Sequence, residues 1–267
     1  FKLPSSMSFS VLYLVTADAA LGRFELSSLS HETLLELLIE DIKNKEVICG
    51  PSSNPKELSN WRGVTVNDND EVTSVKWFLS KLNGRMNLQF LPQTVVVLKL
   101  SNNQLYGSLD FTDLPCGLRE LNFYRNSFSG SISLVSLPKT LESICGFQNK
   151  LEGSLDLTSL PQTLIKVILS NNFFSGAICL TMLPSSIELL SVSRNRLSGP
   201  IDVTRLPASL EALFLNVNKF SGETDFSLLT ESLTSFDVSD TEVAGEMVQV
   251  AGKTYRADNT FVKIVRQ

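Results

Sequence analysis

The sequence predicts a β-rich repeat solenoid, and three features that share one period carry the prediction. A Leu-Pro pair returns every 23 residues over 91–207, an asparagine keeps that spacing over 103–218, and a glycine does so over 84–245. Self-similarity at a fixed period of this size is typical of solenoids and other repeat architectures. About eight registers stay in phase, so we expect one elongated repeat domain over residues 72–250.

The apolar residues of each unit predict a strand that faces a core. In the unit that contains Leu118, Leu121 and Phe123, the last two apolar residues are two apart and point to the same side of a strand. One repeat cannot bury this face alone, so stacked repeats should place the strands side by side in a parallel sheet. We expect Asn126 to bond the backbone of its own turn and of the next repeat. Gly130 should either adopt a positive φ or allow close backbone approach between coils.

The remaining part of the unit returns the chain to the next strand. Asp-x-Thr pairs such as Asp110 and Thr112 can close local turns through side-chain hydrogen bonds. Leu-Pro then continues in extended form, because proline fixes φ and lacks a donor. The complete unit, L-x-x-L-x-L-x-x-N-x-L-x-G-x-L-D-L-T-x-L-P, resembles the leucine-rich repeat family. The resemblance implies an arc with a concave parallel sheet.

Residues 29–71 are predicted to form a helical N-terminal cap. The first part of this segment, up to residue 43, has the pattern of an amphipathic helix with Ser30 as its N-cap. Together with W-R-G-V-T-V at 61–66, it resembles the cap of plant-type leucine-rich repeat ectodomains and of similar protist proteins. Cys49 is present, but Val66 stands where the family has its second cysteine, so the resemblance implies a cap without its disulfide.

The two ends of the chain are expected to lie outside the regular repeats. Residues 1–28 form an N-terminal extension, which we expect to be ordered against the cap or against another chain. A retained or processed targeting segment is the alternative, because residues 9–15 are largely apolar and small residues follow. Residues 251–267 are predicted to form a short C-terminal cap over the last apolar face, or else the start of a further region.

The composition is that of an ordinary globular protein and argues against several partners. The 267 residues are 43% hydrophobic and 19% charged, with a formal net charge of −5. This charge gives no electrostatic case for binding nucleic acid, and no apolar run is long enough for an integral membrane span.

The four cysteines occupy different phases of the repeat, too far apart to pair, and no Asn-x-Ser/Thr sequon occurs. These features favour an intracellular location, with the cell surface or secretion as the alternative.

No constellation of residues predicts catalysis, a cofactor or a metal site. His31, the single histidine, falls in the first turn of the predicted helix, and we expect it to be solvated. The glycines follow the repeat and form no phosphate-binding loop. Residues 67–71 have calcium-ligand residue types but lack the glycine and distal glutamate of a calcium loop, so we expect a hairpin turn. The protein is therefore predicted not to be an enzyme and to use no cofactor.

The outward-facing positions of the predicted concave sheet are the candidate site. They vary from repeat to repeat, whereas the core positions stay apolar apart from Gly146. Exposed aromatic clusters with a polar rim are typical of protein-binding surfaces, and aromatics that merely cover the sheet are the alternative. The candidate partner-binding residues are Phe78, Tyr124, Cys145, Phe147, Ile168, Phe214 and Asn216.

These observations predict a non-catalytic protein–protein interaction module that binds a protein or peptide on its concave face. A structural subunit of a larger multi-protein assembly is the first alternative, motivated by the apolar segment at 9–15, which has no evident core of its own. A surface receptor or adhesion ectodomain is the second, and it rests on the resemblance to plant-type caps. The sequence leaves the partner and the oligomeric state open.

Overall fold

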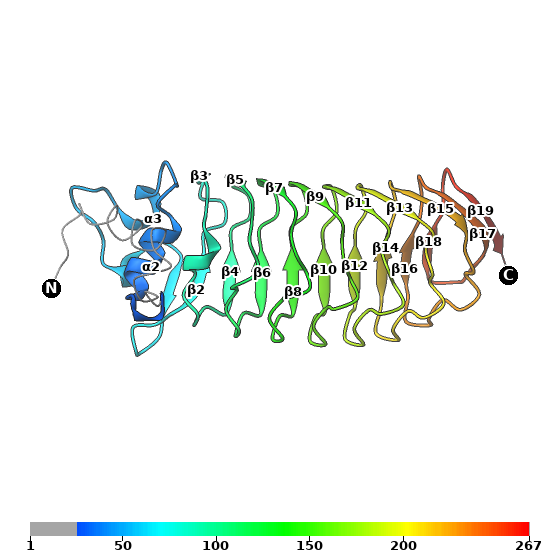
Figure 1. Ribbon diagram of the computed structural model, residues 1–267. Coiled ribbons are helices and arrows are strands. Elements are labelled where there is room, and N and C mark those ends of the chain that lie inside the picture. Colours follow the sequence, from blue (N-terminus) through cyan, green and yellow to red (C-terminus); the bar gives the residue numbers. More distant parts are fainter. Residues whose placement is uncertain (1–25, 267) are drawn as a thin grey trace, which may run out of the picture.

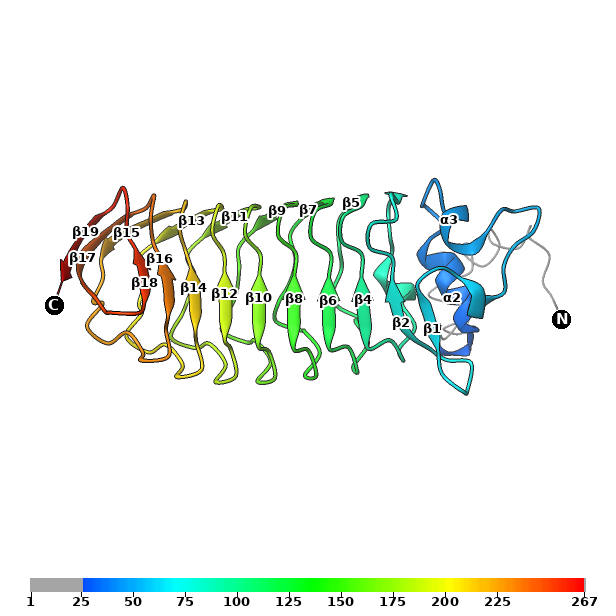
Figure 2. The same cartoon turned by 180° about the vertical axis from the view of Figure 1, so that it is seen from behind.

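The computed structural model describes residues 26–266 and shows the predicted solenoid (Figure 1). Successive coils stack along one axis, with the helical cap at one end, and Figure 2 shows the same stack from behind. The coils contribute to two sheets, one of ten strands and one of nine. The prediction of a leucine-rich repeat solenoid with a parallel sheet is confirmed. Most of the predicted extension at 1–28, including its apolar segment, lies outside the described residues.

The ten-stranded sheet corresponds to the predicted concave sheet and is called the concave sheet below. Its strands are β1 (Val64–Val66), β2 (Val72–Lys76), β4 (Val97–Lys99), β6 (Glu120–Asn122), β8 (Ser143–Cys145), β10 (Lys166–Ile168), β12 (Leu189–Ser191), β14 (Ala212–Phe214), β16 (Ser235–Asp237) and β18 (Thr254–Arg256). From β2 onward neighbouring strands are parallel, and Leu98 pairs with Leu121 one period later. β1 instead runs antiparallel to β2, so the predicted hairpin turn at 67–71 is confirmed.

The nine-stranded sheet follows the turn after each concave strand. Its strands are β3 (Asn83–Gly84), β5 (Gln104–Gly107), β7 (Ser127–Gly130), β9 (Lys150–Gly153), β11 (Phe173–Gly176), β13 (Arg196–Gly199), β15 (Lys219–Glu223), β17 (Glu242–Gln249) and β19 (Phe261–Arg266). The repeated glycine ends most of them, and φ is 78° at Gly130, as predicted. This left-handed conformation carries no steric penalty for a residue without Cβ.

The cap is built from short helices that pack against the first coil. They are η1 (Leu26–Ser28), α2 (His31–Leu38), α3 (Glu46–Cys49) and η2 (Leu58–Asn60), with η3 (Leu88–Phe90) inside the first coil. Ser30 Oγ accepts a hydrogen bond from the Thr33 N–H at 3.1 Å, which confirms the N-cap. The helix ends at Leu38, earlier than predicted, because Ile42 leaves it to form a β-bridge with Gly84.

His31 ties the cap to the concave sheet, so the expectation that it is solvated is wrong. Its side chain is half-buried, and its Nδ1 accepts a hydrogen bond from the Val72 N–H at 2.8 Å. Val72 begins β2, so a histidine in the first turn of α2 satisfies a backbone donor at the start of the sheet. The sequence pattern does not reveal this contact, because the two residues belong to different elements far apart in the chain.

The repeated asparagines form a ladder through the interior of the solenoid. Asn126 Nδ2 donates to Phe123 O at 3.1 Å in its own turn and to Leu100 O at 3.0 Å in the preceding coil. Its Oδ1 accepts from the Leu105 N–H at 3.1 Å, also in the preceding coil. The expected bond of Asn126 to its own turn is therefore confirmed. The expected bond to the next repeat is wrong, because the side chain bonds the preceding coil instead. The carbonyl of Phe123 is bonded again by Asn149, so each asparagine completes the coil before it.

A second ladder, which the sequence analysis does not predict, uses the hydroxyl two residues after the repeated proline. Thr140 Oγ1 lies 2.7 Å from Cys116 O and 2.9 Å from Leu118 O, both in the preceding coil. Equivalent hydroxyls that donate to a preceding coil belong to Thr94, Thr163, Ser186, Ser209 and Ser232. Gly117 takes this place in one coil and lacks the bond. The two ladders together link consecutive coils on both sides of each concave strand.

The predicted Asp-x-Thr turns are present on the outside of the coils. Thr112 donates to Asp110 Oδ1 from its hydroxyl at 2.6 Å and from its backbone N–H at 2.9 Å. The same pair of bonds recurs at Asp156 and at Asp202. The bond from the Thr112 hydroxyl, followed by that from its backbone, lowers the pKa of the Asp110 carboxyl. These carboxylates therefore accept hydrogen bonds within their own local turns.

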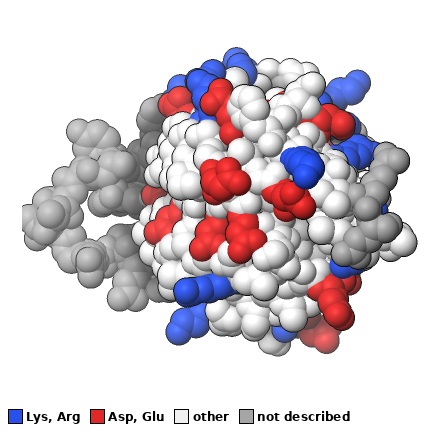
Figure 3. Space-filling model, turned by 90° about the vertical axis from the view of Figure 1, so that its right-hand side faces the viewer, with Lys and Arg blue, Asp and Glu red and all other residues white. Residues whose placement is uncertain are grey.

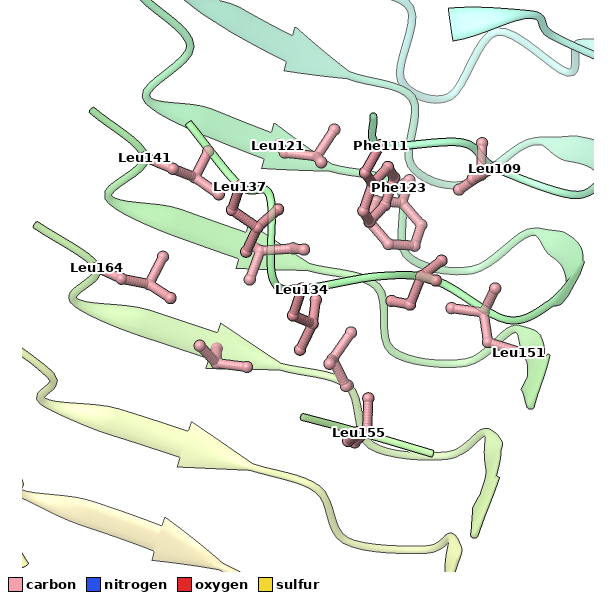
Figure 4. Packing of buried hydrophobic residues seen from close by; sticks show 14 of the residues in the cluster. Leu109, Phe111, Leu121, Phe123, Leu134, Leu137, Leu141, Leu151, Leu155 and Leu164 are labelled. Atoms are coloured by element: carbon pink, nitrogen blue, oxygen red, sulfur yellow. The ribbon is translucent and has the colours of Figure 1, made fainter. Parts of the chain in front are cut away.

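The core departs from its regular pattern where Phe123 meets Gly146. The position that Leu169 fills in a later coil is held by Phe123 in one coil and by Gly146 in the next. A Cβ on Gly146 would lie 2.3 Å from Cζ of Phe123, so the ring occupies the space of the missing side chain. The ring also packs edge-on against Phe111 and Phe128, with centroids 5.9 and 6.1 Å away. Figure 4 shows Phe111 and Phe123 together among the surrounding leucines.

This fit predicts that Gly146→Ala lowers the free energy of unfolding by about 1–3 kcal/mol, because the methyl group clashes with a buried ring. Adding Phe123→Leu should recover a large part of the loss, since leucine leaves room for the methyl group. Urea unfolding followed by circular dichroism measures both variants. Wild-type stability of Gly146→Ala, or a simple sum of the two single losses in the double variant, would contradict the fit.

A second prediction concerns the residue before each ladder asparagine, which adopts a left-handed conformation. φ is 56° at Asn171 and 57° at Val217. A β-branched side chain is strongly disfavoured there, whereas asparagine tolerates it. Val217→Asn should therefore raise the free energy of unfolding by about 1 kcal/mol, and the matched variant Asn171→Val should lower it by a similar amount. Equal unfolding midpoints for both variants and the wild type would show that no strain is stored at Val217.

Candidate functional site

The candidate site lies on the outward side of the concave sheet, over β6, β8 and β10. The middle residues of these strands, Leu121, Ile144 and Val167, are buried in the core. Side chains alternate along a strand, so the last residue of each strand points outward, and the residue two positions later continues in the same direction. Parallel pairing sets the coils about 4.8 Å apart, so both positions form rows along the solenoid.

Tyr124 and Phe147 form the centre of the site. Their rings are stacked, with centroids 4.6 Å apart and an interplanar angle of 11°. Both side chains are half-buried, and the guanidinium carbon of Arg125 lies 5.7 Å from the centre of the Phe147 ring. Arg125 is not among the predicted site residues, because it belongs to the turn beyond the outward rows. A cation–π contact of this kind orients the guanidinium over the ring.

Cys145 and Ile168 extend the stack along the neighbouring row. They end β8 and β10 and lie in direct register. Cys145 is only 8% exposed, whereas Ile168 is half-buried. Burial raises the pKa of the Cys145 thiol to about 11, so this side chain is a neutral, apolar group at physiological pH. Tyr124, Cys145, Phe147 and Ile168 are called the central patch below.

The other predicted site residues lie apart from the central patch. Phe214 ends β14, and Ser191 of β12 stands between it and Ile168 in the same row. Asn216 belongs to the coil of Phe214 and is half-buried. Phe78 follows β2 and is 46% exposed, but the coil of β4 separates it from the central patch. The seven predicted residues therefore form one compact group of four and three outlying members.

Leu189 is an apolar residue of this surface that the predicted set omits. It begins β12, is half-buried and pairs in register with Ala212. It shares the outward side of its strand with Ser191, so it borders the gap between the central patch and Phe214. The first residues of the concave strands form a third outward row, which the predicted set does not include. The period of the repeat places Leu189 in this row.

Two ion pairs border the central patch. Lys99 Nζ lies 2.8 Å from Glu120 Oε1, and Arg119 is paired with Glu142 in the next coil. All four side chains are at least partly exposed, so each pair contributes at most about 1 kcal/mol to stability. Their charges largely cancel, which leaves the apolar side chains as the distinguishing feature of this part of the sheet.

The concave sheet has the character of an open contact surface. Two hollows of about 300 Å³ each lie elsewhere, one beside Cys179 and one beside His31 in the cap. Within residues 26–266 no group of three or more His, Cys, Asp or Glu side chains could hold a metal ion, and all four cysteines are free thiols. In the same part of the chain, no helix combines the length and apolar character needed to cross a bilayer. An open surface of this kind suits a macromolecule better than a small molecule.

Comparison with known proteins shows the fold but no family. No family model and no curated protein matches the sequence. Among solved structures, a TDR receptor is 24% identical over 70% of this chain and 34% of its own, with a TM-score of 0.54. The leucine-rich repeat ectodomain of the receptor kinase GASSHO1/SCHENGEN3 from Arabidopsis thaliana, in complex with CASPARIAN STRIP INTEGRITY FACTOR 2, is 18% identical over 82% of this chain and 30% of its own, with a TM-score of 0.57.

A plant ice-binding protein is also similar, at 16% identity over 88% of this chain and 95% of its own, with a TM-score of 0.50. The chain spans about a third of the length of the two receptor structures. At these identities the shared property is the leucine-rich repeat fold. Receptors and an ice-binding protein share that fold, so the site and not the fold must carry the functional argument.

The geometry of Cys145 predicts a reactivity difference between two thiols. Cys145 should resist alkylation by iodoacetamide at pH 8, because burial limits access and its raised pKa leaves little thiolate. The exposed thiol of Cys116 should react under the same conditions. Labelling of Cys145 should rise only as the pH approaches about 11. Peptide mass spectrometry after short labelling measures both sites, and equal labelling at pH 8 would show that the central patch is not packed as described.

Proposed function

We propose that this chain is a non-catalytic protein-interaction module that binds a protein or peptide partner on the concave sheet at the central patch. The stack of Tyr124 on Phe147 is the observation that carries this proposal. The core beneath these rings is filled by fully buried residues such as Leu121 and Phe123, so packing of the fold does not require two aromatic rings on the outward side. Partly desolvated aromatic groups are the side chains on which protein interfaces concentrate their binding energy.

The surroundings of the central patch favour a protein partner over other ligands. The patch consists of apolar side chains in two neighbouring rows and is bordered by two ion pairs. This arrangement matches an interface core with a polar rim. One of the receptor ectodomains that share this fold is in complex with CASPARIAN STRIP INTEGRITY FACTOR 2, which agrees with binding of a partner by such a solenoid. A permanent subunit of a larger assembly is the alternative, motivated by the apolar segment at 9–15, and size-exclusion chromatography of the native protein separates that case from transient binding.

The proposal predicts that Phe147→Ala weakens partner binding by about 2 kcal/mol, or roughly 30-fold, because it removes one ring of the stack and the contact with Arg125. Affinity capture from native extract with the wild type identifies the partner, and calorimetry with the purified pair measures the change. Met182→Ala is the matched control, since Met182 is 59% exposed in a turn outside the concave sheet.

Circular dichroism of Phe147→Ala checks that the fold is intact. Unchanged affinity of Phe147→Ala, or an equal loss with Met182→Ala, would refute binding at the central patch. Loss confined to Phe147→Ala would support it.

A further inference from the structure

Beside the central patch runs a row of basic side chains, of which the proposed function uses only Arg125. The residues directly before and directly after the ladder asparagines line one edge of the concave sheet. Between Asn102 and Lys219, five of these positions are basic and none is acidic. The five are Arg125, Lys150, Arg194, Arg196 and Lys219, and they are called the basic ridge below.

We infer that the partner segment is an acidic peptide, which lies extended along the solenoid with apolar side chains on the central patch and carboxylates on the basic ridge. This inference rests on the proposed function and names the chemistry of its partner. Lys150, Arg196 and Lys219 begin β9, β13 and β15, so the ridge follows the edge of the solenoid that carries these labels in Figure 1.

The charges of the basic ridge are available for a ligand. All five side chains are exposed. None of them takes part in the salt bridges found within residues 26–266, which join Lys99, Arg119 and Lys263 to glutamates. In a chain with a net charge of −5, such a concentration of unpaired positive charge is a local feature. It creates a potential that attracts anionic groups to this edge and repels cationic ones.

Two arginines of the ridge are held in place by aromatic rings. The guanidinium carbon of Arg196 lies 4.5 Å from the centre of the Phe173 ring, and that of Arg125 lies 5.7 Å from the Phe147 ring. Arg125 Nε also donates to Gln148 Oε1 at 3.2 Å. A guanidinium stacked on a ring keeps its remaining N–H groups at its edge, where they match the two oxygens of a carboxylate. Arg125 therefore connects the ridge directly to the central patch.

The distribution of acidic residues limits where such a peptide can lie. Glu188 and Glu211 precede β12 and β14, so they lie at the opposite ends of the strands from Arg194 and Lys219. The ridge also stops after Lys219, because the same two positions of the next coil are Asp240 and Glu242. Figure 3 shows that acidic side chains gather on this C-terminal end of the solenoid. On the concave sheet an acidic segment is thus favoured along the ridge side and in the coils before that of Asp240 and Glu242.

The dimensions of the ridge define the length of the segment. From the coil of Arg125 to that of Lys219 there are four steps along the solenoid, about 19 Å at ~4.8 Å per step. An extended peptide covers this distance with about six residues, at ~3.3 Å per residue. An anionic polysaccharide would satisfy the ridge but would leave the aliphatic side chain of Ile168 without a partner. The combination of ridge and patch therefore favours a peptide.

The test is a selection from a random library of displayed linear peptides, each of about 12 residues, on the immobilised full chain near 0.15 M salt. We expect the enriched peptides to contain at least two Asp or Glu residues together with an aromatic or aliphatic residue. Enrichment of neutral or basic peptides, or no enrichment while a sulfated polysaccharide binds, would overturn the inference.

Paired charge reversals locate the peptide. With one enriched peptide, Arg194→Glu combined with Arg196→Glu should lower the affinity about tenfold or more and reduce its dependence on salt. Glu188→Lys combined with Glu211→Lys should leave the affinity unchanged or raise it, because it removes acidic charge from the opposite side. Circular dichroism confirms that both variants are folded. An unchanged affinity after reversal of the ridge arginines would overturn the inference.

The variant Phe147→Ala separates this inference from the function on which it rests. Loss of peptide binding with Phe147→Ala but not with the ridge reversal would leave the central patch as the binding site and overturn the acidic partner. Loss with the ridge reversal but not with Phe147→Ala would overturn the central patch as the contact. Loss in both supports the combined surface.

Discussion

The ladder of buried and half-buried asparagines is the interaction on which the rest of the structure depends. Each coil leaves backbone groups in its interior that no strand can satisfy, and an unpaired buried group of this kind costs about 1–3 kcal/mol. Asn172 bonds Gly146 O and the Leu151 N–H in the coil before it, as well as Leu169 O in its own turn. The return of the asparagine at a constant spacing satisfies these groups in each coil over 103–218, which agrees with the strict period of the sequence.

Because the ladders and the core hold the coils together, the outward rows of the concave sheet are free to vary. The two coils that carry Tyr124 and Phe147 also contain the irregular core pair of Phe123 and Gly146. In each of these coils the core residue directly precedes the outward-facing ring, so the irregular packing lies immediately below the stack. The central patch therefore combines an unusual core with an unusual surface, whereas most other coils have neither.

The periodic part of the molecule could be predicted from the sequence, because strand spacing, the glycine turns and the repeated asparagine are local properties of one unit. Contacts between coils could not. The asparagine bonds run backward and not forward, the hydroxyl ladder depends on carbonyls of the preceding coil, and His31 meets Val72 across the cap. The same limit applies to the site. Alignment of the repeats predicts the rows that hold Tyr124 and Phe147, and it also places Ser191 between Ile168 and Phe214. The contact of Arg125 with Phe147 follows only from three-dimensional packing.

Hydroxyl-radical footprinting of the chain with and without its captured partner tests the account most directly, since it maps the contact surface without altering the protein. The account predicts that oxidation of Tyr124, Phe147 and Ile168 falls in the complex. Met182 and Leu228, which are 59% and 58% exposed outside the concave sheet, should be oxidised to the same extent in both samples. Protection of Met182 and Leu228 with no change at Tyr124 and Phe147 would show that the partner binds another face of the solenoid.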